Sequence, residues 1–444
     1  MVFAVEERLA KTPRQIMDEG KMGRWQIAAL GMTILLNALD GFDVMSISYA
    51  APGIAEEWQV SRDVLGWVLS MELIGMAVGS ILLGGLADRF GRRPTILGCL
   101  SVMAIGMVMA PSAAGVTELS IWRLITGLGI GGMLAALNAT VAEFSNARYR
   151  SLVLPLMVTG YPLGAFLGGM LASNVLEAGD WRGVFYLGAV LTIAAIPLSY
   201  WLIPETPDWL SERRPVNALK RINKTLERFG LPTATALPDK LETKNEAALG
   251  DILRPPLLSR TVLLTLAYLT HVTAYYYFVK WIPKLVVDMG FDAGAGGDVL
   301  TKAMLGGAIG GGLLGVFALR IGIKKATIIA LAGAFVMLNV FGRAPHELVL
   351  LGWIAGVTAF FSNAAAVGFY ALLAMAFPPR VRATGTGFGI GFGRAGAAMG
   401  PALAGVLFAR GLDLASVSLI ISVGSALSIA AILMVRISTN AEAK

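Results

Sequence analysis

Residues 84–95 read GGLADRFGRRPT, a short charged segment between two long apolar ones. A candidate membrane span at residues 64–86 leads into it, and another at residues 94–113 follows it. Each has about the 20 residues that a helix needs to cross a hydrocarbon core of roughly 30 Å. The pattern recurs along all 444 residues, of which 56% are hydrophobic and 15% charged. Because soluble domains are far less apolar, the sequence predicts an integral membrane protein. The other predicted spans are residues 25–50, 118–142, 151–175, 183–203, 260–285, 298–319, 324–342, 347–370, 383–409 and 413–435.

The basic residues are concentrated in every second loop between the predicted spans. They gather before the first span, in the longest loop and after spans two, four, eight and ten, whereas the alternate loops are acidic or nearly neutral. Loops rich in Lys and Arg favour the cytoplasmic side, so twelve spans with both termini in the cytoplasm are predicted, in the inner cell membrane. The net charge of +7 then follows from topology, and no nucleic-acid partner is expected. The charged first residues lack the apolar core of a cleavable signal peptide, and Cys99, the single cysteine, excludes an internal disulfide.

One long polar interval, residues 204–259, divides the chain. It contains the basic stretch PVNALKRINKTLERFG (215–230), which we interpret as a cytoplasmic linker helix. The predicted organisation is therefore a cytoplasmic N-terminal segment (1–24), a six-helix bundle (25–203), the linker (204–259), a second six-helix bundle (260–435) and a cytoplasmic tail (436–444).

The two bundles repeat each other. Two six-helix repeats related by an axis along the membrane normal place a substrate site near the midplane, between the halves. Glycines four residues apart are expected mainly to let helices approach closely. A shift of 231 residues places Gly75, Gly79, Gly84, Arg89 and Gly91 on Gly306, Gly310, Gly315, Arg320 and Gly322. One more residue of shift places Arg148, Arg150, Gly164 and Gly168 on Arg380, Arg382, Gly396 and Gly400.

The GGLADRFGRRPT segment resembles the signature loop of the major facilitator superfamily. Its degenerate copy, GVFALRIGIKK (315–325), has Leu319 where the first has Asp88, so the charge-dependent part is expected once. Within the superfamily, LDGFD (39–43) resembles the DGxD signature of aromatic acid:proton symporters, with further agreement in RLITGLGIGG (123–132), EFSNARYR (143–150) and VRATGTGFGIGFGRAGAAMGP (381–401). PETPDWL (204–210) resembles a sugar-porter motif. Drug antiporters often carry a proline where GYPLGAFLGG (160–169) has Ala165, which counts mildly against export.

Asp40 and Asp43 stand inside the first span. Counting about 1.5 Å per residue from Trp25 places Asp40 just beyond mid-membrane and Asp43 one turn further out, on the same helix face. Burial and a like-charged neighbour both favour the protonated form of a carboxyl group. Gly41 between them allows another backbone to approach, or the helix to loosen. We expect the pair to serve in proton coupling and substrate binding; the alternative is two hydrated acids at a frayed helix end.

Two arginines are expected to act with them. Arg394 lies near the middle of span eleven, where its planar guanidinium suits a substrate carboxylate or a membrane aspartate. Arg123 lies at a depth comparable with Asp43 and matches a span-four arginine that the resemblance associates with proton coupling. Snorkelling of Arg123 to the outer interface is the alternative.

The remaining candidates are weaker. The 231-residue shift places His271 on Asp40, so it is either a cavity residue or a hydrogen-bonded structural histidine. Tyr276, Phe361 and Asn363 are predicted to surround an aromatic ring, and Lys280 to attract anions from nearer the outer side. The role of Glu72 stays open. A cytoplasmic gate is predicted from Gly84, Asp88, Arg89, Gly91 and Arg92, together with Glu143, which is expected to pair with Arg148 or Arg150.

No enzyme or metal site is expected, because the chain has only two histidines and one cysteine and no clustered ligand spacing. No ATP site is expected, because the sequence lacks a P-loop. The prediction is a monomeric major facilitator protein that imports a small aromatic carboxylate with protons across the lipid bilayer, without a cofactor and powered by the proton gradient. The alternatives are a proton-coupled exporter of aromatic or drug-like compounds and a transporter-like ligand sensor. The sequence does not select one aromatic acid.

Overall fold

Long helices make up most of the part of the chain that the structure describes. A computed structural model describes residues 11–83, 85–237, 249–378 and 380–435, and within them twelve helices are long and apolar enough to cross a membrane. The predicted class, an all-helical membrane protein with twelve spans, is confirmed. The spanning helices are α2 (Arg24–Glu57), α3 (Arg62–Leu82), α5 (Arg92–Met109, followed by a 3₁₀ turn over Ala110–Ser112), α6 (Val116–Phe144), α7 (Arg150–Glu177), α8 (Trp181–Leu202), α12 (Leu258–Asp288), α13 (Ala293–Ile321), α14 (Ile323–Phe341), α15 (Leu348–Ala376), α16 (Arg382–Ala409) and α17 (Leu414–Met434).

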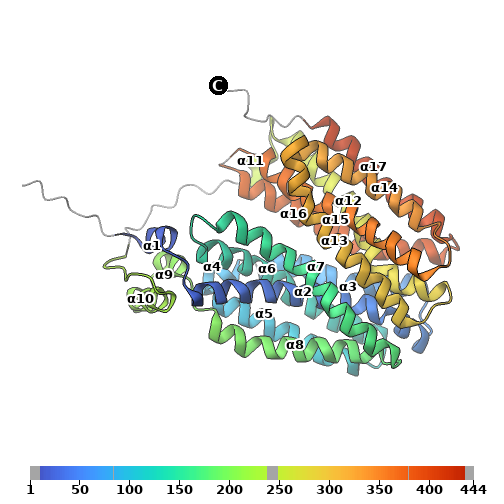
Figure 1. Ribbon diagram of the computed structural model, residues 1–444, viewed down its shortest axis with the longest axis horizontal. Coiled ribbons are helices and arrows are strands. Elements are labelled where there is room, and N and C mark those ends of the chain that lie inside the picture. The colour runs from blue at the N-terminus through green and yellow to red at the C-terminus, as the bar shows by residue number, and fades with distance from the viewer. Residues whose placement is uncertain (1–10, 84, 238–248, 379, 436–444) are drawn as a thin grey trace, which may run out of the picture.

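Shorter helices gather at one end of the bundle, which we call the linker end; the opposite end is the far end (Figure 1). They are α1 (Pro13–Glu19), α4 (Leu86–Phe90), α9 (Pro207–Arg213), α10 (Ala218–Phe229) and α11 (Leu249–Ile252). The predicted linker helix is α10. Ile222, Leu226 and Phe229 recur at helical spacing and are buried, and Phe229 packs edge-on against Phe144 of α6 with ring centroids 5.2 Å apart. The helix ends at Gly230, whose φ of +76° suits glycine.

The spanning helices form two groups of six that lie side by side and diverge toward the linker end (Figure 1). In the first, α2 packs against α7 and α8, and α3 against α6. In the second, α12 packs against α16 and α17, and α13 against α15. The pairs α2–α7 and α12–α16 are equivalent under the repeat, as are α3–α6 and α13–α15.

Glycines explain the equivalent pairs. A methyl group added at Gly164 of α7 would lie 1.8 Å from the carbonyl oxygen of Ala38 in α2. One added at Gly396 of α16 would lie 2.4 Å from the carbonyl oxygen of Leu269 in α12. The 231-residue shift also relates Ala38 to Leu269, so the same backbone contact occurs in both halves. Only glycine allows helices to approach this closely.

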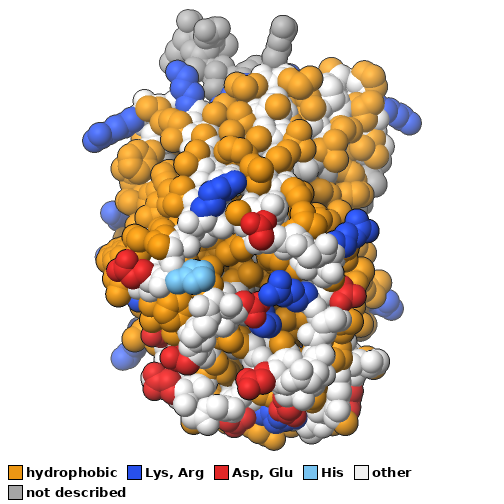
Figure 2. Space-filling view, turned by 90° about the vertical axis from the view of Figure 1, so that its right-hand side faces the viewer, with side chains coloured by type: hydrophobic (Ala, Val, Ile, Leu, Met, Phe, Trp, Pro, Cys, Tyr) orange, Lys and Arg blue, Asp and Glu red, His pale blue; other side chains and the backbone are white. Residues whose placement is uncertain are grey.

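The two halves contact each other at the far end. A methyl group added at Gly66 of α3 would lie 2.6 Å from the carbonyl oxygen of Pro401 in α16. Arg62 and Asp288 form an ion pair of 3.0 Å across the same interface, and Figure 2 shows acidic and basic side chains close together over this end. Within the described residues, polar contacts between the halves are found at this end and at mid-depth. The structure is therefore closed at the far end.

We expect Gly164→Ala to destabilise the protein by about 1–3 kcal/mol, because the new methyl group separates α2 from α7. Thermal unfolding of the purified protein in detergent measures the change. Gly312→Ala is the matched control, since nothing lies within 4 Å of a methyl group at that position. Equal melting temperatures for the two variants would contradict the close contact between α2 and α7.

Candidate functional site

Asp40 and Asp43 lie on α2 in the centre of the first half. Their exposed fractions are 2% and 0%, and α2 continues past them to Glu57, so they are not hydrated acids at a frayed helix end. Asp43 accepts a hydrogen bond from Thr192 of α8 at 3.3 Å. Within the described residues, neither carboxylate oxygen of Asp40 has a hydrogen-bond partner. The backbone at Gly41 approaches Tyr161 of α7, whose carbonyl oxygen would lie 1.9 Å from an added methyl group.

Arg123 of α6 and Glu72 of α3 form a wholly buried ion pair. Arg123 also donates to the carbonyl oxygen of Asp43 at 2.7 Å, and its guanidinium lies over the ring of Phe185, 5.2 Å from the centroid. Arg123 therefore points into the helical bundle and does not snorkel to the outer interface. The depth that the sequence predicts for it, level with Asp43, agrees with this hydrogen bond.

Lys280 of α12 brings a second buried cation to Glu72. Its ammonium lies 3.7 Å from the Glu72 carboxylate and donates to the carbonyl oxygen of Val44. Sequence reasoning left the role of Glu72 open and placed Lys280 near the outer side. The available signal was the presence of opposite charges within apolar spans, but their pairing across the halves depends on the tertiary structure.

Arg394 of α16 is half-buried. Its charge acts on Asp40 and on Tyr276 of α12, while Tyr276 also interacts with Tyr161 of the first half. Within the described residues, Arg394 has no hydrogen bond or ion pair. Arg394 is thus within electrostatic range of Asp40 and of Tyr276, two other residues that the sequence proposes for substrate binding.

Three further proposed binding residues, His271, Phe361 and Asn363, contact their own half. His271 Nε2 lies 2.9 Å from the carbonyl oxygen of Ser362; because a carbonyl only accepts, Nε2 donates, and Nδ1 can accept from the Ser425 hydroxyl at 3.3 Å. This geometry fits the structural alternative for His271. The ring of Phe361 packs onto Gly333 of the peripheral helix α14 and so points away from the centre. Asn363 donates to the Gly307 carbonyl of α13 at 2.8 Å.

At the linker end, Arg92 is the centre of the charged network. Its guanidinium pairs with Glu143 at 2.7 Å and with Asp88 at 3.0 Å, and its backbone N–H donates to Glu205 at 2.9 Å. Gly91 has φ of +111°, and a methyl group there would lie 2.1 Å from a Glu205 carboxylate oxygen. Burial raises the pKa of Glu205 above its ordinary value. The network thus joins the signature loop to the PETPDWL segment.

The predicted pairing of Glu143 with Arg148 or Arg150 is wrong, because Glu143 pairs with Arg92 instead. The end of α6 packs beside the start of α5, which brings Arg92 to Glu143, whereas Arg150 pairs with Asp18 of α1. Arg148 is exposed over the ring of Tyr149. Arg89 is exposed over the ring of Phe90, and Gly84 lies outside the described residues. Closeness along the chain in a loop does not determine the direction of side chains, which explains the difference.

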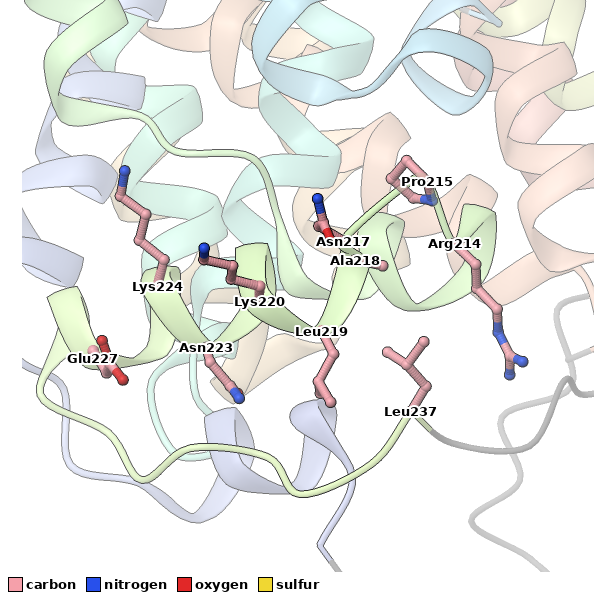
Figure 3. A pocket seen from close by; sticks show the side chains of 10 residues that line it. All are labelled: Arg214, Pro215, Asn217, Ala218, Leu219, Lys220, Asn223, Lys224, Glu227 and Leu237. Carbon is pink, nitrogen blue, oxygen red and sulfur yellow. The ribbon is translucent and has the colours of Figure 1, made fainter.

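An open pocket of about 900 Å³ lies on the linker, away from the charged centre (Figure 3). Most of its lining residues belong to α10 and the turn before it. Because α10 is outside the two helical bundles, this pocket is not part of the charged centre. Its lining residues are Arg214, Pro215, Asn217, Ala218, Leu219, Lys220, Asn223, Lys224, Glu227 and Leu237.

Comparisons with known proteins place this geometry in context. The family model described as Major Facilitator Superfamily matches residues 33–353. The chain is 28% identical to a gallate transporter of Pseudomonas putida over 90% of this chain and 89% of that one. It is 26% identical to a 4-hydroxybenzoate transporter of the same species over 97% of each. Among solved structures, the xylose transporter XylE from E. coli in an inward open conformation matches with a TM-score of 0.71 and 18% identity, covering 94% of this chain and 98% of that one.

We expect Arg123→Gln to destabilise the protein by about 3–5 kcal/mol, because it removes the cation that compensates buried Glu72 in its own half. All variants are made in a Lys280→Met background, which leaves Glu72 and Arg123 as an isolated pair; there the double variant Glu72→Gln, Arg123→Gln should lose less, since both charges are then absent. Arg148→Gln, at an exposed arginine, is the control. Thermal unfolding in detergent measures these three variants and Glu72→Gln alone; a double variant that loses the sum of the two single effects would show that Arg123 and Glu72 do not interact.

Proposed function

Because the chain belongs to the Major Facilitator Superfamily, we propose that it is a secondary transporter that imports a small aromatic carboxylate together with protons. The observation that carries the proposal is the set of charges at mid-depth, most of them buried inside the first of two repeated bundles and one of them, Lys280, reaching in from the second. The names of the similar proteins, which transport gallate and 4-hydroxybenzoate, support an aromatic acid as the substrate. The family and these relatives are transporters and not enzymes.

The basic loops support a cytoplasmic linker end, in the inner cell membrane. The described structure, closed at the far end, then corresponds to the inward-facing state. In the proposed cycle the substrate arrives from the far end and places its carboxylate near Arg394 and its ring near Tyr276 and Tyr161. Rocking of the halves opens the linker end, where Arg92 and Glu143 contribute to the gate. The protein acts as a monomer and needs no cofactor.

Charge balance supports one proton for each substrate. Within the described residues, the centre holds three acidic side chains, Asp40, Asp43 and Glu72, and three basic ones, Arg123, Lys280 and Arg394. A substrate carboxylate adds one negative charge, and charge without compensation is costly in an apolar interior. A proton on Asp40 or Asp43 restores the balance. Asp40 is the better candidate, since its carboxylate oxygens have no hydrogen-bond partner among the described residues.

Uptake into proteoliposomes tests this function. With 4-hydroxybenzoate, benzoate and gallate offered in turn, we expect accumulation in response to an inward proton gradient and loss of accumulation with a protonophore. Because a monoanion with one proton carries no net charge, an imposed membrane potential alone should drive no uptake. If the vesicles accumulated only a non-aromatic acid, the proposed substrate class would be wrong. If they accumulated substrate only when the proton gradient was directed outward, the protein would exchange substrate for protons, as an exporter does.

Asp40→Asn tests the site of coupling. The amide cannot exchange a proton, so accumulation driven by the gradient should fall about tenfold or more, while counterflow between labelled and unlabelled substrate persists. Asp63→Asn, at the far end of α3, is the control and should leave both assays unchanged. An Asp40→Asn protein that still concentrates substrate would show that the proton is carried elsewhere.

A further inference from the structure

Lys280 crosses from one half of the protein to the other. It belongs to α12 of the second half, yet its ammonium contacts the carbonyl oxygen of Val44 in α2 and lies 3.7 Å from Glu72 in α3. It is wholly buried, as is Glu72. Both partners of its ammonium at this interface therefore belong to the opposite half.

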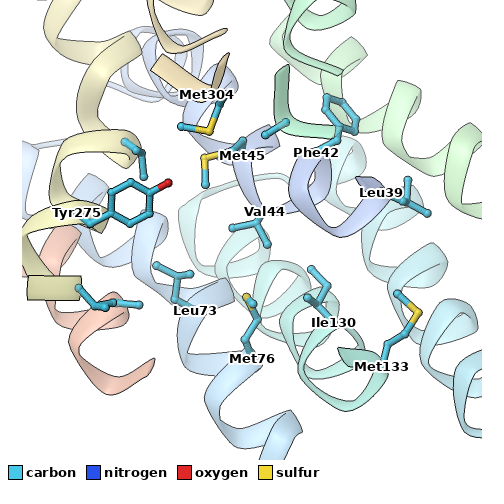
Figure 4. Packing of buried hydrophobic residues seen from close by; sticks show 14 of the residues in the cluster. Leu39, Phe42, Val44, Met45, Leu73, Met76, Ile130, Met133, Tyr275 and Met304 are labelled. Atoms are coloured by element: carbon cyan, nitrogen blue, oxygen red, sulfur yellow. The ribbon is translucent and has the colours of Figure 1, made fainter. Parts of the chain in front are cut away.

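The surroundings of this contact are apolar. Val44, Met45 and Leu73 of the first half pack together with Tyr275 and Met304 of the second half (Figure 4). An ammonium group in such a place is costly unless an anion compensates it. Lys280 thus depends on Glu72 for as long as the two halves are closed at this depth.

Glu72 does not depend on Lys280 in the same way. Arg123 of its own half forms an ion pair with it, and that contact stays when the halves move apart. Separation at the far end would therefore leave Lys280 without an anion while Glu72 kept a cation. Lys280 lies about two turns from the far end of α12, so the opening would expose it to solute from that side.

The internal repeat provides a neutral counterpart. The 231-residue shift places Tyr49 on Lys280, and Tyr49 also crosses the interface, with its hydroxyl 3.4 Å from that of Thr301 in α13. At equivalent positions, the first half thus reaches across the interface with the Tyr49 hydroxyl group and the second half with the Lys280 ammonium group. The two crossings are equivalent in position, and only the charged one requires an anion.

We propose that Lys280 alternates between two anionic partners: Glu72 when the far end is closed, and the carboxylate of the arriving substrate when it is open. The first partner follows from the contacts alone; the second rests on the proposed function. Lys280 is then a positioning residue that holds the far end closed in the absence of substrate and offers the carboxylate its first cation when that end opens.

Distances between spin labels test the first partner without substrate. Ser61→Cys and Arg410→Cys place labels at exposed far-end positions in the two halves, in a Cys99→Ala background. Glu72→Gln leaves Lys280 buried without its anion, so the distances should shift to longer values. Adding Lys280→Met should reverse the shift, because no cation of the second half is then left without its anion at the contact between the halves, while Arg123 stays within the first half. Tyr49→Phe, the matched control, should leave the distances unchanged.

A double variant as open as Glu72→Gln alone would overturn the first partner, since the opening would then act through Arg123. Distances that Glu72→Gln leaves unchanged would also overturn the first partner. For the second partner, Lys280→Met should raise the Kd for 4-hydroxybenzoate about tenfold, and Lys280→Arg should restore part of the affinity. An unchanged Kd in Lys280→Met would overturn it. If the unmodified protein binds none of the three aromatic acids, the proposed function fails, while the distances still decide the first partner.

Discussion

A charge inside a bundle surrounded by hydrocarbon needs a compensating charge, and this constraint organises the centre of the protein. Six ionisable side chains from α2, α3, α6, α12 and α16 meet there within the described residues. Arg123 and Glu72 satisfy each other inside one half, and Lys280 is satisfied only by reaching into the other. Asp40 and Arg394 lie within electrostatic range of each other without forming an ion pair, which leaves both available to a proton or a carboxylate. The distribution of satisfied and unsatisfied charges thus separates structural groups from candidate working groups.

Small residues make this centre possible. Glycines on α7 and α16 bring these helices against the backbones of α2 and α12 at equivalent positions, and the rigid pairs hold Asp40 and Asp43 in the first half and Lys280 in the second. Because packing replaces the hydrophobic effect within lipid, close backbone contact determines where these side chains point. Between the halves, by contrast, the tight backbone contacts lie at the far end, and the bundles diverge toward the linker end.

The halves share a backbone plan and differ in chemistry. The position of Asp40 is occupied by His271 in the second half, where hydrogen bonds to Ser362 and Ser425 satisfy it. The position of Lys280 is occupied by Tyr49 in the first. The linker end shows the same asymmetry, since Arg92, Glu143 and Asp88 form their network within the first half and the second copy has Leu319 in place of Asp88. The two repeats thus share one backbone arrangement, and the charged residues lie at positions where the two copies differ.

The sequence by itself determined the twelve spans, the two repeats, the linker helix and the positions of Asp40, Asp43, Arg123 and Arg394 inside spans. These follow from hydropathy, from a 231-residue period and from a fixed rise per residue, all of which are local or periodic properties of the chain. Only the tertiary structure decided the partners: Glu72 with Arg123 and Lys280, Glu143 with Arg92, and Phe361 with α14. The physical reason is that the direction of a side chain depends on the rotation and the neighbours of its helix. A sequence read without structural context specifies neither.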